Sequence, residues 1–210
     1  MADAITGGRE RILQRIRAAL PREREPVAQP QLDVFAPILD PLSRFQAECK
    51  ANLTECVLVG AELRAKLQQL LAELPEGEIF VEDTPRLREL LAGTDRAVRW
   101  SAQGPPLESS IATISRTHFL IAQTGSLLVS SGCGGRGASV VAPVHIVVAH
   151  ERQLVPDLET AMKLASEQKL AEKHSFVGLI TGCSRTGDIE KLLVIGAHGP
   201  KRLVVLVDQT

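Results

Sequence analysis

The 210-residue sequence has no tyrosine, one tryptophan and five phenylalanines, so aromatic residues make up only 3% of it. Proteins that bind single-stranded nucleic acid stack bases on aromatic side chains, and this chain offers few such platforms. Its net charge of −1 provides no basic field that would attract nucleic acid or an anionic membrane. The composition therefore argues against a nucleic-acid-binding module.

Long apolar runs and paired cysteines are also missing. No run approaches the roughly 18 residues of a membrane-spanning helix, and residues 1–20 lack the apolar core of a signal peptide. Cys49, Cys56, Cys133 and Cys183 lack the two-residue gap typical of zinc or iron–sulfur ligands. We therefore expect unreactive or buried thiols, no metal or other cofactor, and a cytoplasmic location.

The N-terminal region, residues 1–41, is predicted to be an arm. Apolar residues between Ile5 and Leu20 share one helical face, arginines lie largely elsewhere, and Pro21 ends the pattern. Residues 21–41 contain five of the twelve prolines, which is typical of a linker. We expect the basic helix to pack against its own domain or against a second subunit of a homo-oligomer.

Residues 42–210 have the pattern of a single α/β domain. Helical stretches at 42–53, 62–74 and from Thr84-Pro85 alternate with strand-like runs at 56–59, 79–81 and 97–100. Further strands are expected at 119–122, 127–130, 146–149, 176–180 and 203–207, and a helix with Leu158, Ala161, Met162 and Ala165 on one face. This alternation predicts right-handed βαβ crossovers and a mostly parallel sheet with flanking helices.

A glycine-rich run at residues 132–137 matches the Gly-x-Gly-x-x-Gly dinucleotide pattern. That fingerprint needs a helix directly after it, yet Pro143 and the strand-like run from Ile146 follow closely. We therefore expect a loop, in which Arg136 is the one strong anion donor.

Two other segments are candidate anion sites. Residues 181–190 leave a predicted strand and enter a short helical pattern, where Ser184, Arg185, Thr186 and Asp188 either bind an anion at the helix N-terminus or merely cap it. The Thr124-Gly125-Ser126 turn is a second cradle, or a plain turn. If both segments lie at the carboxyl ends of adjacent strands, they face one crevice with Arg136 beside it. Glu190 and His198 are then the groups able to move a proton.

The order of four motifs, at residues 121–127, 143–146, 181–190 and 196–200, resembles the lactate-utilisation domain (LUD) family, in its single-domain lactate utilisation protein C branch. The resemblance implies a fold similar to ribose-phosphate isomerase, coenzyme A transferases and formyltetrahydrofolate cyclo-ligase. It also implies a role beside iron–sulfur proteins that oxidise L-lactate to pyruvate. Cys183 and Gly187 stand where the family commonly has proline and alanine.

Three functions follow as hypotheses. The first is an accessory component of L-lactate oxidation, with a site for a small anionic ligand and no redox centre of its own. The second is a free-standing enzyme acting on a phosphorylated sugar, a folate or an acyl-coenzyme A, for which Glu190 is the candidate nucleophile. The third is a non-catalytic assembly factor. Fold analogy does not choose among them.

Overall fold

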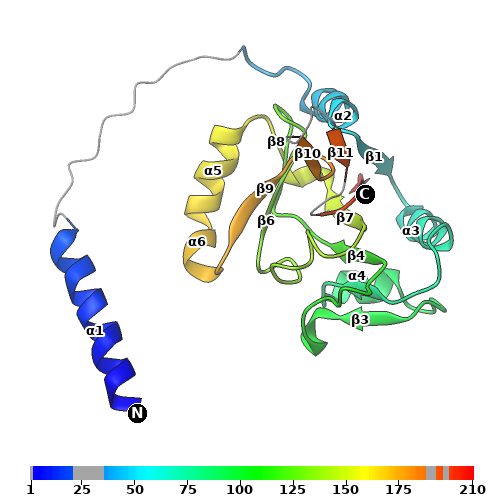
Figure 1. Cartoon of the computed structure of the whole chain (residues 1–210). Coiled ribbons are helices and arrows are strands. Elements are labelled where there is room, and N and C mark those ends of the chain that lie inside the picture. Colours follow the sequence, from blue (N-terminus) through cyan, green and yellow to red (C-terminus); the bar gives the residue numbers. More distant parts are fainter. Residues whose placement is uncertain (1, 21–35, 188–192, 196–198) are drawn as a thin grey trace. The chain divides into compact units, whose positions relative to one another are not determined.

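The computed structural model describes residues 2–20, 36–187, 193–195 and 199–210. The chain divides into two units, Met1–Pro37 and Ile38–Thr210. The first unit contains helix α1 (Ala2–Ala19), at the place where the amphipathic pattern predicts one (Figure 1). What this helix packs against stays a prediction.

The second unit is built on a six-stranded sheet in which every pairing is parallel, in the order β1-β12-β7-β4-β2-β3. Its strands are β1 (Thr54–Val59), β2 (Ile79–Val81), β3 (Val98–Trp100), β4 (Ala112–Ser115), β7 (Val144–His150) and β12 (Arg202–Asp208). Along β12, residues 203–207 are all apolar and all buried, because both faces of the sheet are covered. The predicted α/β class with a mostly parallel sheet is confirmed.

Helices α3 (Leu63–Ala72) and α4 (Pro85–Leu90) cover one face of this sheet. The leucines of α3 recur at helical spacing and pack with Val204 and Leu206 of β12. Helix α4 begins where the Thr84-Pro85 pair predicts, since the Thr84 hydroxyl accepts a hydrogen bond of 3.2 Å from the backbone of Leu87.

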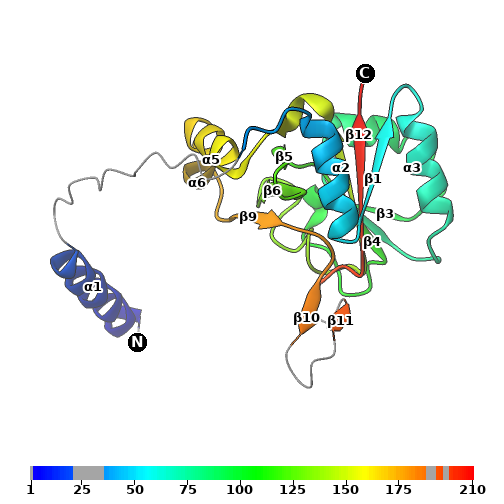
Figure 2. The same cartoon turned by 90° about the horizontal axis from the view of Figure 1, so that it is seen from above.

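The opposite face is covered by helix α2 (Pro41–Ala51) and by a four-stranded mixed sheet in the order β8-β5-β6-β9 (Figure 2). These strands are β5 (Phe119–Ile121), β6 (Ser126–Ser130), β8 (Leu154–Val155) and β9 (Val177–Ile180). Strand β9 is an edge strand, so Leu179 is 46% exposed and this strand is less buried than the sequence suggested.

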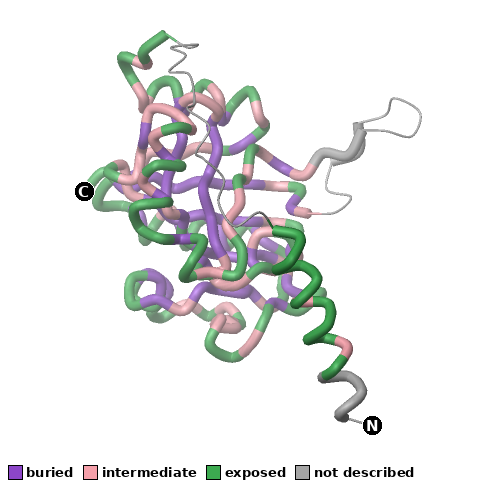
Figure 3. The backbone as a smooth tube through the Cα atoms, turned by 90° about the vertical axis from the view of Figure 1, so that its left-hand side faces the viewer, coloured by how far each residue is buried: buried purple, intermediate pink, exposed green. Residues whose placement is uncertain are grey.

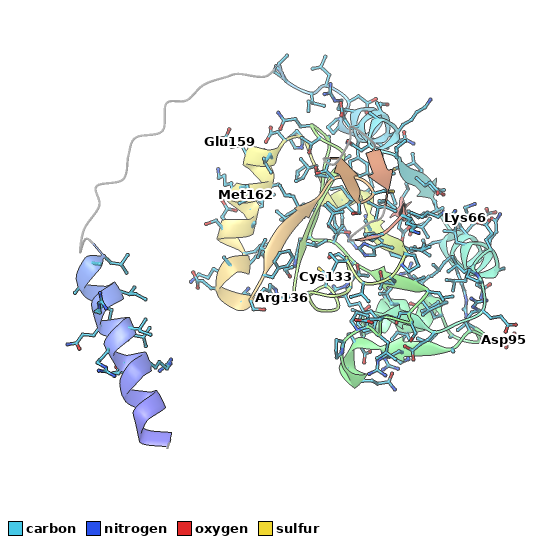
Figure 4. All side chains as sticks on the ribbon, in the orientation of Figure 1. Lys66, Asp95, Cys133, Arg136, Glu159 and Met162 are labelled. Atoms are coloured by element: carbon cyan, nitrogen blue, oxygen red, sulfur yellow. The ribbon has the colours of Figure 1, made fainter. Side chains whose placement is uncertain are left out.

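Helices α5 (Leu158–Glu167) and α6 (Leu170–Lys173) pack on the outer face of the mixed sheet. Ala161 and Ala165 are buried there, whereas Met162 is 51% exposed and points away from the sheet (Figure 4). Met162 was predicted on the same helical face as Ala161 and Ala165, but it lies at the exposed margin of that face. Figure 3 shows the resulting layers, with buried residues following the strands and exposed residues following the helices.

Residues after β9 differ from expectation. Arg185–Gly187 forms strand β10, which pairs antiparallel with β11 (Leu193–Ile195), and Figure 2 shows this hairpin extending away from the two sheets. The prediction of a helix N-terminus at Ser184–Thr186 is therefore wrong. The acidic residues that suggested a helix start were a weaker signal than the strand-forming run Leu193–Ile195.

Candidate functional site

The turn between β5 and β6 depends on Gly125. Its φ of +63° lies in the left-handed region, which side chains other than glycine seldom adopt. A Cβ atom at this position would also lie 2.8 Å from the backbone nitrogen of Cys49 and 2.8 Å from the carbonyl carbon of Glu48. The turn is thus pressed against the last turn of α2, and only glycine fits.

Helix α2 also braces the turn by hydrogen bonds. The side-chain amide of Asn52, just after α2, donates to the carbonyl oxygen of Thr124 at 3.0 Å. The Cys49 thiol donates a long hydrogen bond of 3.9 Å to the carbonyl oxygen of Gly125. Neither Asn52 nor Cys49 was a predicted site residue, because no local sequence pattern shows which turn a helix end will meet.

Three hydroxyl groups form a chain across the turn. The Ser126 Oγ atom lies 2.7 Å from Thr124 Oγ1 and 2.7 Å from Thr181 Oγ1. Ser126 is buried, whereas Thr181 is exposed. Each hydroxyl carries one hydrogen, so the two hydrogen bonds use two hydrogens and leave one free donor, which lies at an end of the chain when both bonds run in the same direction. An anion at that end would orient all three hydroxyls in the same direction.

The same end of the mixed sheet gathers all four motifs that carried the family resemblance. The backbone N–H of Ser184 donates to the carbonyl of Pro200 at 3.0 Å. The carbonyl of Pro143 accepts from the N–H groups of Lys201 at 2.8 Å and Arg202 at 3.2 Å. Together with the Ser126–Thr181 contact, these bonds join four segments, residues 124–126, 143, 181–184 and 199–202. Residues 124–126 and 181–184 follow the carboxyl ends of β5 and β9, whereas residues 143 and 199–202 lie at the amino ends of β7 and β12.

Several predicted site residues are not described. Asp188, Glu190 and His198 lie outside the described residues, as do the side chains of Arg185 and Thr186. Of their described neighbours in the sequence, Gly187 belongs to strand β10 of the hairpin, and Gly199 lies close to Ser184. The roles predicted for these five residues stay predictions.

Arg136 lies at the other end of β6. Residues 131–143 form turns with no helix before β7, as predicted, and the guanidinium of Arg136 donates to the carbonyl of Ser175 at 2.5 Å (Figure 4). Ser175 precedes β9, whose residue Val177 pairs with Ser130. The full length of β6 therefore separates Arg136 from the Thr124–Ser126 turn, and the two do not share a crevice.

A polar pair that the sequence reasoning missed lies at the carboxyl ends of β2 and β4. The Glu82 carboxylate is buried and accepts three hydrogen bonds from Arg116, one from the backbone at 2.7 Å and two from the guanidinium at 3.0 and 2.7 Å. Although burial lowers it, the hydrogen bonds and charge of Glu82 raise the pKa of Arg116 above its ordinary value. The sequence signal that could have indicated this pair is a charged residue directly after each strand.

His145 of β7 is completely buried and its Nε2 atom lies 2.8 Å from the hydroxyl of Ser115. Burial lowers the pKa of His145 to about 4, so the ring is neutral near pH 7. Among the described residues, its Nδ1 atom has no hydrogen-bond partner. His145 therefore has a structural role within the parallel sheet.

The described residues lack two further kinds of feature. They contain no group of three or more histidine, cysteine or acidic side chains placed to hold a metal ion. They also contain no helix with the length and hydropathy required to cross a bilayer.

Comparison with known proteins gives concordant matches. Residues 107–207 match the LUD domain family. The lactate utilization protein C of Geobacillus sp. (strain WCH70) is 29% identical over 203 residues, covering 85% of this chain and 83% of that protein. That of Bacillus subtilis (strain 168) is 24% identical, covering 94% and 95%.

Among solved structures, a DUF162 family protein from Deinococcus radiodurans is similar, with a TM-score of 0.61 and 18% identity. The match covers 80% of this chain and 96% of that one, and it shows a shared fold. Sequence and fold agree: residues 107–207 match the LUD domain family, and most of the chain is similar to proteins named lactate utilization protein C.

Proposed function

We propose that this protein is an accessory component of L-lactate oxidation, and that it binds a small anion at the end of the mixed sheet where the hydroxyl chain lies. The relatives named lactate utilization protein C support the first part. The observation that carries the second part is the convergence of the four motifs on one another through Ser126–Thr181, Ser184–Pro200 and Lys201–Pro143.

The hydroxyl chain suits a carboxylate or phosphate better than a cation. A hydroxyl donates its hydrogen to an anionic oxygen, and the buried Ser126 transmits this polarity between Thr124 and Thr181. Arg185, at the start of the hairpin that follows Thr181, would add the charge and a two-pronged donor. The chemistry of the site is thus binding and orientation, with Glu190 and His198 as the groups that would move a proton.

In this proposal the redox centre belongs to partner iron–sulfur proteins. The four cysteines of this chain pack in the apolar cluster between α2 and the two sheets, and the described residues contain no group of three or more cysteine, histidine or acidic side chains that could hold a metal ion. Purified protein is expected to contain neither iron nor acid-labile sulfide in stoichiometric amounts. Stoichiometric iron or sulfide would contradict this part of the proposal.

Calorimetric titration with L-lactate, pyruvate and inorganic phosphate tests the anion site. A charge-assisted hydrogen bond contributes about 1.5–3 kcal/mol, so Arg185→Ala should weaken binding roughly 10- to 100-fold. Arg136→Ala is the matched control, since Arg136 lies at the far end of β6 and should leave the affinity unchanged. The reverse result would place the site beside the glycine-rich loop.

Deletion of the gene tests the role. Loss of growth on L-lactate, together with co-purification of iron–sulfur proteins, is the expected result. Normal growth, combined with turnover of a phosphorylated sugar, a folate or an acyl-coenzyme A, would favour a free-standing enzyme. If the deletion strain fails to grow on L-lactate but the strain carrying Arg185→Ala grows normally, the result would favour an assembly factor.

A further inference from the structure

Two of the four cysteines lie against each other. Cys49 belongs to the last turn of α2 and Cys56 to β1, and only a short connection around Asn52 and Leu53 separates the two elements. Both side chains pack in the same apolar cluster, and the interaction between the two thiols shifts the pKa of each. Both are free thiols. The seven-residue spacing thus brings both thiols into one apolar cluster, on two consecutive elements of the chain.

The two thiols have unequal access to solvent. Cys49 is completely buried. Cys56 is only half-buried and lines a surface hollow together with Gln46, Lys50, Leu53, Thr54 and Glu55. A small molecule entering this hollow would meet Cys56 and not Cys49.

Their acidities differ in the same sense. The hydrogen bond from the Cys49 thiol lowers the pKa of Cys56, although burial opposes it. The same hydrogen bond, with burial, raises the pKa of Cys49. The thiolate therefore forms first on the accessible sulfur, and the thiolate is the nucleophile in disulfide exchange.

We propose that Cys49 and Cys56 form a redox-active dithiol that a low-molecular-weight disulfide oxidises to an intramolecular disulfide. The Cys56 thiolate attacks one sulfur of the oxidant, which gives a mixed disulfide and releases one thiolate. Cys49 then loses its proton and attacks the Cys56 sulfur, which releases the second thiolate. Overall, two cysteine thiols are oxidised and one small disulfide is reduced to two thiols.

Oxidation would also affect the Thr124–Ser126 turn. The Cys49 sulfur lies 3.9 Å from the Gly125 carbonyl oxygen, and its one hydrogen, which either this oxygen or the Cys56 sulfur can accept, is lost when the disulfide forms. Because Gly125 also lies against the backbone of Cys49, any shift of α2 is transmitted to the turn. The dithiol itself does not depend on what the turn binds.

Peptide mapping of the native full-length protein tests the proposal directly. After treatment with oxidised glutathione, remaining thiols are alkylated and the protein is digested without reduction. Trypsin cleaves after Lys50, between the two cysteines, so the disulfide would join peptide 45–50 to peptide 51–64. The expected product is this cross-linked pair, with Cys133 and Cys183 alkylated only after unfolding. Two separate peptides, each alkylated, would overturn the proposal.

Variants separate the two roles. Cys49→Ser should stop at a glutathione adduct on Cys56, whereas Cys56→Ser should react at least about tenfold more slowly at Cys49, which is buried. Cys133→Ala is the control and should form the disulfide as the wild type does. Equal rates for Cys49→Ser and Cys56→Ser would refute the assignment of Cys56 as the attacking thiol. Faster amide exchange across residues 122–126 in the oxidised protein is expected, and unchanged exchange would refute the coupling to the turn.

Discussion

Replacement of Gly125 by alanine tests how tightly the turn is packed against α2. The left-handed backbone at φ +63° costs an L-residue roughly 1–2 kcal/mol. The added Cβ would meet backbone atoms of Glu48 and Cys49 at 2.8 Å, and backbone in a helix cannot rotate away as a side chain can. Overpacking of this kind typically costs about 1–3 kcal/mol. The variant should therefore lose roughly 2–5 kcal/mol of unfolding free energy.

Gly93→Ala is the matched control. Gly93 also has a left-handed backbone, with φ +77°, but nothing lies within 4 Å of a Cβ placed there. It should lose only the conformational part, roughly 1–2 kcal/mol. The difference between the two variants isolates the contact between the turn and α2.

Urea unfolding and thermal melting measure that difference. For a domain of this size, 1 kcal/mol corresponds to about 2–4 °C in Tm, so Gly125→Ala should melt roughly 2–12 °C below Gly93→Ala. Equal melting temperatures would refute the close approach of the turn to α2. They would also remove the structural basis for coupling Cys49 to the turn.

Three further predictions concern other parts of the chain. Burial lowers the pKa of His145 from 6.5 to about 4. As the pH falls, the unfolded chain therefore takes up the proton first, and the free energy of unfolding should fall by about 3 kcal/mol between pH 6.5 and pH 4. Urea unfolding at a series of pH values measures this slope, which His145→Gln should lack. Arg116→Ala leaves the buried Glu82 carboxylate without its cation and should lower the free energy of unfolding by about 2–3 kcal/mol. This is less than for a fully buried ion pair, because Arg116 is half exposed. An unchanged free energy of unfolding in urea would contradict this. A chain beginning at Leu42 should lose stability or change its oligomeric size in gel filtration, and if neither changes the N-terminal helix is free.

The elements that could be predicted from the sequence are those with local signals. Thr84-Pro85 and Asp157 mark helix starts through their own backbone preferences, and their side chains accept the expected capping bonds. The unbroken apolar run of β12 indicates a strand buried on both faces. Strand β4 was missed because Ala112–Ser115 is short and half polar, and it is held by pairing with β2 and β7.

The site was only partly predictable, because its geometry depends on contacts between distant residues. The Thr124–Ser126 turn and the segment from Thr181 were both chosen for their glycines and hydroxyls, yet their contact depends on the antiparallel register of β6 and β9. The bracing comes from Asn52 at the end of α2, which lies 72 residues before Thr124 in the sequence. No motif contains such information.

The two edges of the sheets present different polar groups, and this difference supports the place that we propose for the anion site. The usual rule places ligands at the carboxyl ends of parallel strands, where β2 and β4 present Glu82 and Arg116. There the cation already holds a buried carboxylate, so a second anion would have to compete with Glu82 for Arg116. The mixed sheet brings the carboxyl ends of β5 and β9 to the opposite edge, beside the amino ends of β7 and β12. That edge presents the hydroxyls of Thr124, Ser126 and Thr181 instead of a buried carboxylate, so in our proposal the mixed sheet, and not the parallel one, positions the anion site.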